Sequence, residues 1–140
     1  MDTERQREID EKYMYMCEQI AQLSRATRAK VGALIARDGV IISTGFNGTP
    51  RGTSNECEQN NVTVPTLIHA EVNAILNMVI SGNGASLNGA TIYVLYSPCP
   101  QCAAIIKQVG ICRVVYRHEY RLTEGIDFLR TYGVEVVRMP

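Results

Sequence analysis

The sequence predicts an α/β fold in three layers, in which helices cover both faces of a five-stranded mixed sheet. Three features lead to this prediction: an opening segment with helical apolar spacing, two β-branched runs separated by Asp38-Gly39, and strands that alternate with helices through the second half. An Asp-Gly pair between apolar runs is a strong hairpin signal. Alternating strands and helices imply parallel strands joined by right-handed crossovers. We therefore expect the first hairpin to be antiparallel and the later strands to be parallel.

The first helix is predicted over residues 8–24, because its apolar residues recur at alternating steps of four and three. Its inward face would consist of Ile9, Tyr13, Met16, Ile20 and Leu23. The hairpin follows, with strands at 31–37 and 40–44, and then a polar, glycine-rich loop at 45–61 and a helix at 66–80. The remaining elements are a glycine-rich ending at 81–89, strands at 91–96, 113–117 and 134–139, and helices at 100–109 and 123–132, the last with Ile126 and Leu129 inward.

The composition predicts one soluble domain spanning residues 1–140, with neither a membrane nor a nucleic acid as partner. Fourteen basic side chains balance fourteen acidic ones, whereas nucleic-acid binders normally carry a basic excess. A single nucleotide needs only a local positive cluster. The first twelve residues lack the apolar segment of a signal peptide, and no apolar run reaches the length that spans a bilayer. With an odd number of cysteines, five, these features indicate a cytoplasmic protein.

Two short motifs carry the candidate chemistry. The segment HAEVNAIL at 69–76 places His69 and Glu71 at the front of a predicted helix, and SPCPQC at 97–102 places Cys99 and Cys102 at a strand-to-helix junction. A Cys-x-x-Cys pair at such a junction is a common zinc-binding arrangement. Taken alone, His69 could equally be a core histidine beside a solvated glutamate.

One imidazole nitrogen and two sulfurs make three ligands, which is typical of a catalytic zinc whose fourth position belongs to water. A structural zinc would need a fourth protein ligand, and the remaining candidates show no matching spacing: Cys17, Cys57, Cys112 and His118. Glu71 is then expected to carry protons, as general base and later as general acid. The backbone N–H groups around Ala70, in the first helical turn, lack intrahelical acceptors and could donate to a substrate carbonyl.

The order H-x-E followed by P-C-x-x-C is the signature of zinc deaminases. Over residues 13–137 the chain resembles the cytidine and deoxycytidylate deaminase superfamily, and within it the deoxycytidylate (dCMP) deaminases. The segments that carry this resemblance are RAKVGALI at 28–35, GFNGTPRG at 45–52, HAEVNAIL at 69–76 and SPCPQCA at 97–103. The resemblance implies conversion of dCMP to dUMP and ammonia, which supplies dUMP for thymidylate synthesis.

The resemblance also implies roles for individual residues. His69, Cys99 and Cys102 match the ligands of one catalytic Zn²⁺ per chain, whose bound hydroxide attacks C4 of the base while Glu71 shuttles the proton. The expected substrate contacts are Asn47 at the sugar, Ala70 at the base, Arg25, Arg28 and Lys30 at the 5′-phosphate, Tyr120 as a wall of the base pocket, and Ser97. Asn47 could instead be a turn residue with positive φ. Ser97 could instead cap the following helix, Tyr120 could be a packing residue, and the three basic side chains could simply be solvated surface residues.

Family members imply a homo-oligomer, often a hexamer, that dCTP and dTTP regulate with Mg²⁺, although this chain has a short segment before its HAE motif. Other substrates remain open: dCTP, a 5-substituted dCMP or a nucleoside. A deaminase that edits tRNA or single-stranded DNA would show a basic groove and strong salt dependence. A non-catalytic zinc domain would tolerate the loss of Glu71.

Overall fold

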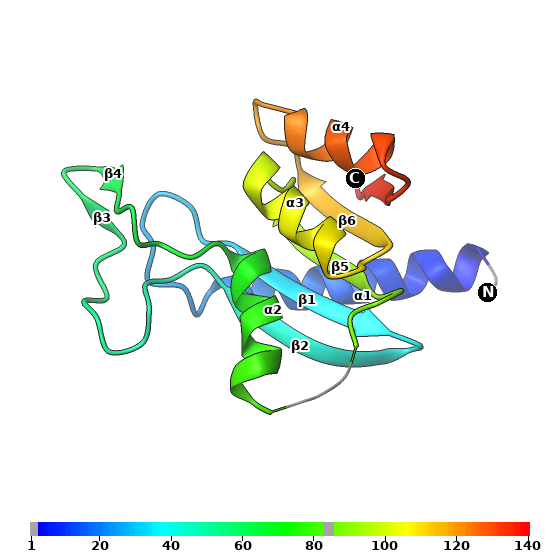
Figure 1. Ribbon diagram of the computed structural model, residues 1–140, viewed down its shortest axis with the longest axis horizontal. Coiled ribbons are helices and arrows are strands. Elements are labelled where there is room, and N and C mark those ends of the chain that lie inside the picture. Colours follow the sequence, from blue (N-terminus) through cyan, green and yellow to red (C-terminus); the bar gives the residue numbers. More distant parts are fainter. Residues whose placement is uncertain (1–2, 83–85) are drawn as a thin grey trace.

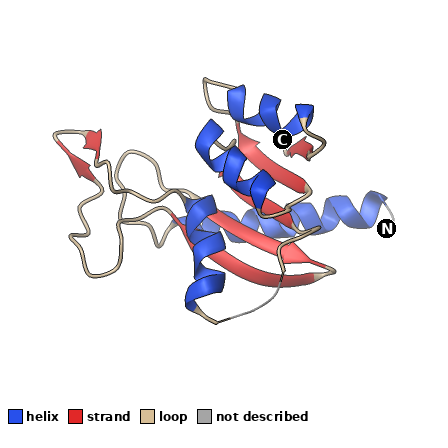
Figure 2. Cartoon of the chain, viewed as in Figure 1, coloured by secondary structure: helices blue, strands red, loops and turns tan. Residues whose placement is uncertain are grey.

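The computed structural model of the chain describes residues 3–82 and 86–140, and it confirms the predicted α/β class. Its helices are α1 (Thr3–Ala21), α2 (Ala70–Ile80), α3 (Pro100–Gln108) and α4 (Glu124–Thr131). Its main strands are β1 (Gly32–Arg37), β2 (Val40–Phe46), β5 (Thr91–Tyr96), β6 (Arg113–His118) and β7 (Glu135–Arg138). They form one sheet of order β2-β1-β5-β6-β7. In Figures 1 and 2 the helix α1 passes behind this sheet and α2 lies in front of it.

The sheet is antiparallel in its first half and parallel in its second. β1 pairs antiparallel with both β2 and β5, whereas β5, β6 and β7 run parallel. The helix α1 packs mainly on β1 and β5, while α2 lies on β2 and β1 and α3 lies beside α4 (Figure 1). The crossovers β5-α3-β6 and β6-α4-β7 bring the start of α3 next to the end of β5. This junction positions Cys99 and Cys102 of the candidate site.

The predicted hairpin turn is confirmed. Asp38 and Gly39 both have positive φ, at 52° and 78°, as a two-residue turn of this type requires. Most other element ends agree with the prediction to within one or two residues, which is the ordinary uncertainty of helix and strand boundaries. The prediction of the first helix over residues 8–24 is wrong at both ends: α1 begins at Thr3, because its first turn is polar and shows no apolar periodicity, and it ends at Ala21. Residues 83–85 of the predicted glycine-rich ending lie outside the described part of the chain.

The predicted inward face of α1 is displaced by one position, although Tyr13 and Ile20 do pack, partly buried, against the core. The residues that α1 buries fully are Asp10, Met14, Cys17 and Ala21, whereas Leu23 lies beyond the helix with 66% of its surface exposed. Small residues occupy the closest approach to the sheet, since a Cβ on Gly32 would lie 2.2 Å from the Cys17 carbonyl oxygen. A hydrophobicity pattern favours the larger flanking residues, so it misplaces a face built on a carboxylate and small side chains.

Two further expectations need correction between residues 45 and 70. The helix predicted at 66–80 begins at Ala70, with His69 as its extended N-cap residue (φ −68°, ψ 154°). The end of the predicted loop and the two residues after it form a small hairpin of β3 (Glu58–Gln59) and β4 (Val62–Thr63), which projects from the body of the molecule (Figure 1). Its turn residues Asn60 and Asn61 both have positive φ. Asparagine tolerates this conformation, so the Asn-Asn pair was the available signal for the hairpin.

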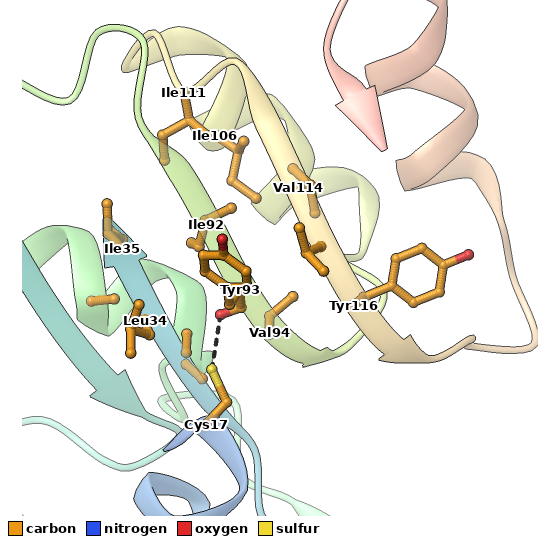
Figure 3. Close-up of a cluster of buried hydrophobic side chains, with 14 of the residues drawn as sticks. Cys17, Leu34, Ile35, Ile92, Tyr93, Val94, Ile106, Ile111, Val114 and Tyr116 are labelled. Atoms are coloured by element: carbon orange, nitrogen blue, oxygen red, sulfur yellow. Dashed lines mark hydrogen bonds between the residues drawn. The ribbon is translucent and has the colours of Figure 1, made fainter. Parts of the chain in front are cut away.

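The core is built on the central strands. Tyr93 and Val94 of β5 and Val114 of β6 are almost fully buried, and Figure 3 shows their side chains with those of the neighbouring elements. The Cys17 thiol donates to the Tyr93 carbonyl at 3.4 Å (Figure 3), and burial raises its pKa to about 12. Cys17 is therefore a packing residue of the core.

A buried ion pair joins α1 to the sheet. Asp10, 3% exposed, accepts two hydrogen bonds from the Arg113 guanidinium at 2.9 and 2.6 Å. It also accepts one from the Tyr93 hydroxyl at 2.7 Å and one from Gln6 at 2.9 Å. Burial alone would raise the pKa of Asp10, but these bonds from Arg113, Tyr93 and Gln6 together hold it below its ordinary value of 3.8. The carboxylate is thus charged and satisfied inside the fold.

We expect Arg113→Met to lower the free energy of unfolding by about 3–5 kcal/mol, because it leaves the Asp10 charge buried without its partner. Since the folded-state pKa of Asp10 is depressed, its wild-type contribution is complete above pH 3.8 and is lost as the pH falls through the folded-state value. Urea unfolding at several pH values measures both effects. Arg5→Met, which breaks the exposed Arg5–Glu8 pair, should cost less than about 1 kcal/mol; equal losses in the two variants would contradict the prediction.

Candidate active site

The candidate site lies where the N-termini of α2 and α3 meet. His69 is the N-cap of α2, and Cys99 is the N-cap of α3, with Pro100 in the first turn of that helix. Proline suits this position because the first helical N–H has no acceptor. Cys102, one turn into α3, is buried beside them. The starts of these two helices therefore bring His69 next to Cys99 and Cys102, which lie 30 and 33 positions further along the chain.

The ligand atoms of His69, Cys99 and Cys102 all lie within 4.8 Å of one another. The Nδ1 atom of His69 is 3.2 Å from the Cys102 sulfur and 3.7 Å from the Cys99 sulfur. Ligands at about 2.1 Å (nitrogen) and 2.3 Å (sulfur) around tetrahedral zinc are about 3.6 Å apart, so the three residues fit a zinc ion. Within residues 3–82 and 86–140 no other such group of three or more occurs, and Cys17, Cys57, Cys112 and His118 do not join this one.

The thiols of this group differ in their affinity for a proton. Hydrogen bonds from Cys102 and His69 lower the pKa of Cys99 to about 4. The same bond to Cys99, together with burial, raises the pKa of Cys102. The bond to Cys99 also raises the pKa of His69. The lowered pKa of Cys99 favours its thiolate, which is the form that ligates zinc.

Glu71 lies in the first turn of α2 and is only 4% exposed. Burial raises the pKa of its carboxyl above the ordinary value of 4.5. Since α2 begins at Ala70, the Ala70 N–H belongs to the first turn and has no acceptor within the helix. A buried carboxyl and a free backbone donor thus stand next to the His-Cys-Cys group.

His69, Ala70 and Glu71 line a cavity of about 110 Å³, whereas Cys99 and Cys102 are not among its lining residues. The sequence-predicted residues on its wall are Asn47, His69, Ala70, Glu71 and Tyr120. Residues that sequence reasoning missed are Ala29, Val31, Thr63, Leu67 and Tyr96. Thr63 comes from the β3–β4 hairpin, between the predicted loop and the predicted helix, and Leu67 comes from the segment predicted as the start of that helix. Tyr96 ends a predicted strand directly before Ser97-Pro98-Cys99, and that adjacency was the signal that could have identified it.

Asn47 is buried and fixed by the protein itself. Its Oδ1 accepts from the Val31 N–H and its Nδ2 donates to the Ala29 carbonyl, both at 2.9 Å. An amide offers two N–H groups and two lone pairs, so one of each stays available toward the cavity. Its φ is not positive; the alternative reading as a left-handed turn residue is wrong.

The three basic residues predicted for phosphate binding are exposed on the segment between α1 and β1. Arg28 approaches the cavity most clearly, because its Nη1 donates to the Thr63 hydroxyl at 3.3 Å and Thr63 lines the wall. The Glu58 carboxylate accepts from the backbone N–H groups of Thr27 and Arg28, which ties this segment to the β3–β4 hairpin. Arg25 lines two neighbouring surface hollows, and Lys30 lines none of the hollows described here.

Tyr120 stacks on Tyr96 with ring centroids 5.5 Å apart, so both rings form one side of the cavity. Burial, with the nearby Glu71 charge, raises the pKa of Tyr120 to about 12. The Ser97 hydroxyl accepts a hydrogen bond from the Tyr120 backbone N–H at 2.8 Å. Ser97 does not cap α3, whose N-cap is Cys99; it holds the Tyr120 segment in place.

A His-Cys-Cys group that could hold a metal ion, beside a buried glutamate at two helix starts, is typical of zinc-dependent deaminases. The family described as the cytidine and deoxycytidylate deaminase zinc-binding region matches residues 7–118. The deoxycytidylate deaminase of Enterobacteria phage T4 is 33% identical over 86% of this chain and 84% of its own length. The dCMP deaminase of cyanophage S-TIM5, solved in complex with dCMP and dUMP, is 42% identical, with a TM-score of 0.90 over 99% of both chains.

The chain belongs to the cytidine and deoxycytidylate deaminase family. This confirms the resemblance seen in the sequence, and the whole-length structural match confirms the predicted fold. The roles of the individual site residues remain predictions, which the following proposal develops.

Proposed function

We propose that this protein catalyses the hydrolytic deamination of dCMP to dUMP and ammonia, thereby supplying dUMP for thymidylate synthesis. The observation that carries the proposal is the buried Glu71 beside the His-Cys-Cys group on the wall of a small cavity. At about 110 Å³ the cavity is smaller than the roughly 300–1,000 Å³ typical of drug-sized pockets, so it suits a pyrimidine base whose sugar and phosphate lie outside. The similarity to two phage deoxycytidylate deaminases supports the same substrate.

His69, Cys99 and Cys102 would hold one zinc ion. Zinc bound there supplies a Lewis acid that lowers the pKa of water to about 7 and so makes a nucleophile available at neutral pH. In the overall reaction a C4–O bond forms and the C4–N bond breaks. Glu71 takes a first proton from the water and delivers it to the ring nitrogen next to C4. It then takes the second proton from the new C4 hydroxyl and delivers it to the departing amine, which leaves as ammonia.

The chain's other groups bind and orient the nucleotide. The Ala70 N–H donates to the carbonyl oxygen of the base, and the stacked Tyr96 and Tyr120 rings cover one side of the cavity. The free N–H of the Asn47 amide faces the sugar. Arg28 contacts the 5′-phosphate, supported by its approach to Thr63 at the cavity wall. Arg25 and Lys30 would contribute positive charge nearby, while Ser97 acts through the Tyr120 segment rather than on the substrate.

Other parts of the proposal rest on family resemblance. We propose a single domain over residues 1–140 that binds one zinc and forms a homo-oligomer, a hexamer by family resemblance, in the cytoplasm. Regulation by dCTP and dTTP with Mg²⁺ stays a prediction of that resemblance. In the described part of the chain no helix is long and apolar enough to cross a membrane. Sedimentation velocity and nucleotide titration of the activity test the oligomer and the regulation.

Ammonia release from a substrate panel tests the proposed reaction. The panel contains cytidine, CMP, dCMP, dCTP, 5-methyl-dCMP and a cytosine-containing oligonucleotide. We expect kcat/KM to be highest for dCMP, with cytidine at least about 10-fold lower because it lacks the charge-assisted contacts to the phosphate. Preference for the oligonucleotide, with steep loss of binding as salt rises, would establish an editing deaminase and reject the proposal. Preference for dCTP or cytidine would reject dCMP as the substrate.

A further inference from the structure

Asn73 links two parts of the candidate site that are distant in sequence. Its side-chain Nδ2 donates to the Phe46 carbonyl at 2.8 Å and approaches the Ile68 carbonyl at 3.5 Å. Phe46 directly precedes Asn47, and Ile68 directly precedes His69. The Asn73 side chain therefore contacts the backbone directly before Asn47, the proposed sugar contact, and directly before His69, the proposed metal ligand.

The contact is one of two side-chain hydrogen bonds from α2 to β2, one of the two edge strands of the five-stranded sheet. One helical turn further along α2, Asn77 donates to the Thr44 carbonyl at 2.8 Å. Two carbonyls two residues apart on a strand are separated by about 6.8 Å, and two side chains four residues apart on a helix by about 6.0 Å. The two spacings nearly match, so both amides can bond to the same strand without distortion.

Close packing of α2 on β2 makes these bonds possible. A Cβ on Gly45 would lie 2.4 Å from the Ala74 backbone nitrogen, so only glycine allows this approach. The Ser43 hydroxyl also donates to the Ala74 carbonyl at 2.6 Å. The helix and the strand are thus held as one unit by Ser43, Gly45 and the two asparagines.

Of the two asparagines, only Asn73 lies at the end of the α2–β2 contact that is next to the cavity. There the residues that follow β2 meet the residues that precede α2, because Gly48 and Ile68 exchange two backbone hydrogen bonds at 2.8 and 3.1 Å. Asn77 lies at the opposite end of the contact and reaches no residue of the cavity wall. The two amides make the same kind of bond, but only that of Asn73 reaches the backbone next to Asn47 and His69.

We propose that Asn73 is a positioning residue: by binding the Phe46 carbonyl it fixes Asn47 relative to the start of α2, where His69 and Glu71 lie. The inference deepens the proposed function and rests on it for its activity readout. A misplacement of about 1 Å in a substrate-orienting group can cost as much as about 100-fold in rate. Loss of the amide is therefore expected to impair catalysis in protein that is still fully folded.

Matched variants test this role. Asn73→Ala and Asn77→Ala each remove one side-chain amide from the same helix, so both should lower the melting temperature by similar amounts. Below that temperature, Asn73→Ala should reduce kcat/KM for the preferred substrate of the panel by about 10-fold, while Asn77→Ala leaves it near the wild-type value. Combining Asn73→Ala with Asn47→Ala should add little to the effect of Asn47→Ala alone, because coupled residues are not additive.

A second readout does not depend on the substrate. Asn73→Ala should weaken zinc binding about 10-fold in competition with a chelator, whereas Asn77→Ala should not. If wild-type protein deaminates no member of the panel, the proposed function fails, and the zinc comparison still decides the positioning role. Equal activity and zinc affinity in the two variants would overturn the inference. It would also be overturned if Asn73→Ala and the isosteric Asn73→Asp both failed to fold while Asn77→Ala folded, since the role would then be structural.

Discussion

Replacing Glu71 by glutamine is expected to reduce the turnover of dCMP by about 10²–10⁴-fold, the usual contribution of a positioned general acid–base. Glutamine keeps the shape of the side chain in its buried position but cannot accept the proton of the attacking water. Because Glu71 is not among the three metal-ligand atoms, the variant should retain its zinc and still bind dCMP. Steady-state ammonia release, calorimetric binding of dCMP and metal analysis measure the three quantities.

Glu124 provides the matched control for this substitution. It also lies in the first turn of a helix, α4, but it is exposed and absent from the cavity wall. Glu124→Gln should therefore leave turnover unchanged. Equal turnover by wild type and Glu71→Gln would reject the proton-transfer role and favour a non-catalytic zinc domain. Loss of zinc in Glu71→Gln would instead show that the carboxylate takes part in metal binding.

Replacing Cys102 by alanine is expected to remove the zinc and to reduce turnover by more than about 100-fold, since even residues that only support metal ligands typically cost 10–100-fold. A zinc site needs its deprotonated sulfurs, and two remaining ligands cannot hold the ion against competing buffer. Metal analysis should show one zinc per chain in wild type and close to none in the variant. The variant should also melt at a lower temperature, because a ligand that binds only the folded state stabilises it.

The exposed Cys112 is the control for the loss of a thiol. Its sulfur donates to the Gly89 carbonyl, remote from the metal group, so Cys112→Ala should keep one zinc and full turnover. Chelation of wild-type protein should reproduce the inactivity of Cys102→Ala, and added zinc should reverse it. Two tightly held zinc ions per chain would contradict the single-site prediction, and zinc retained by Cys102→Ala would contradict its assignment as a ligand.

Elements with strong local signals were predictable. The Asp38-Gly39 turn is confirmed because both residues must accept positive φ, a requirement that belongs to the two residues themselves. The small β3–β4 hairpin was missed although Asn60-Asn61 gives a related signal, because strands of two residues carry no periodicity. The inward face of α1 was misplaced because burial of Asp10 depends on Arg113, which lies 103 residues away.

The residues of the candidate site likewise fall into two groups: those in motifs, which were predictable, and those placed by packing, which were not. Order and spacing of His69, Glu71, Cys99 and Cys102 identified the chemistry, since a metal group needs particular atoms and the motifs supply them. The cavity wall was only partly predictable. Tyr96, Thr63 and Leu67 line it without any motif of their own, because a wall is set by whichever side chains the fold brings there.

The sequence by itself determined the α/β class, the family and the residue types that would hold zinc and move protons. These follow from local propensities and from motifs in which a few residues carry the chemistry. Only the tertiary structure decided that β1 pairs with β5, that His69 caps α2 instead of lying within it, and that Asn73 ties the helix to the edge strand. Such contacts join residues far apart in the chain, and their geometry depends on the packing of whole elements, which no short stretch of sequence contains.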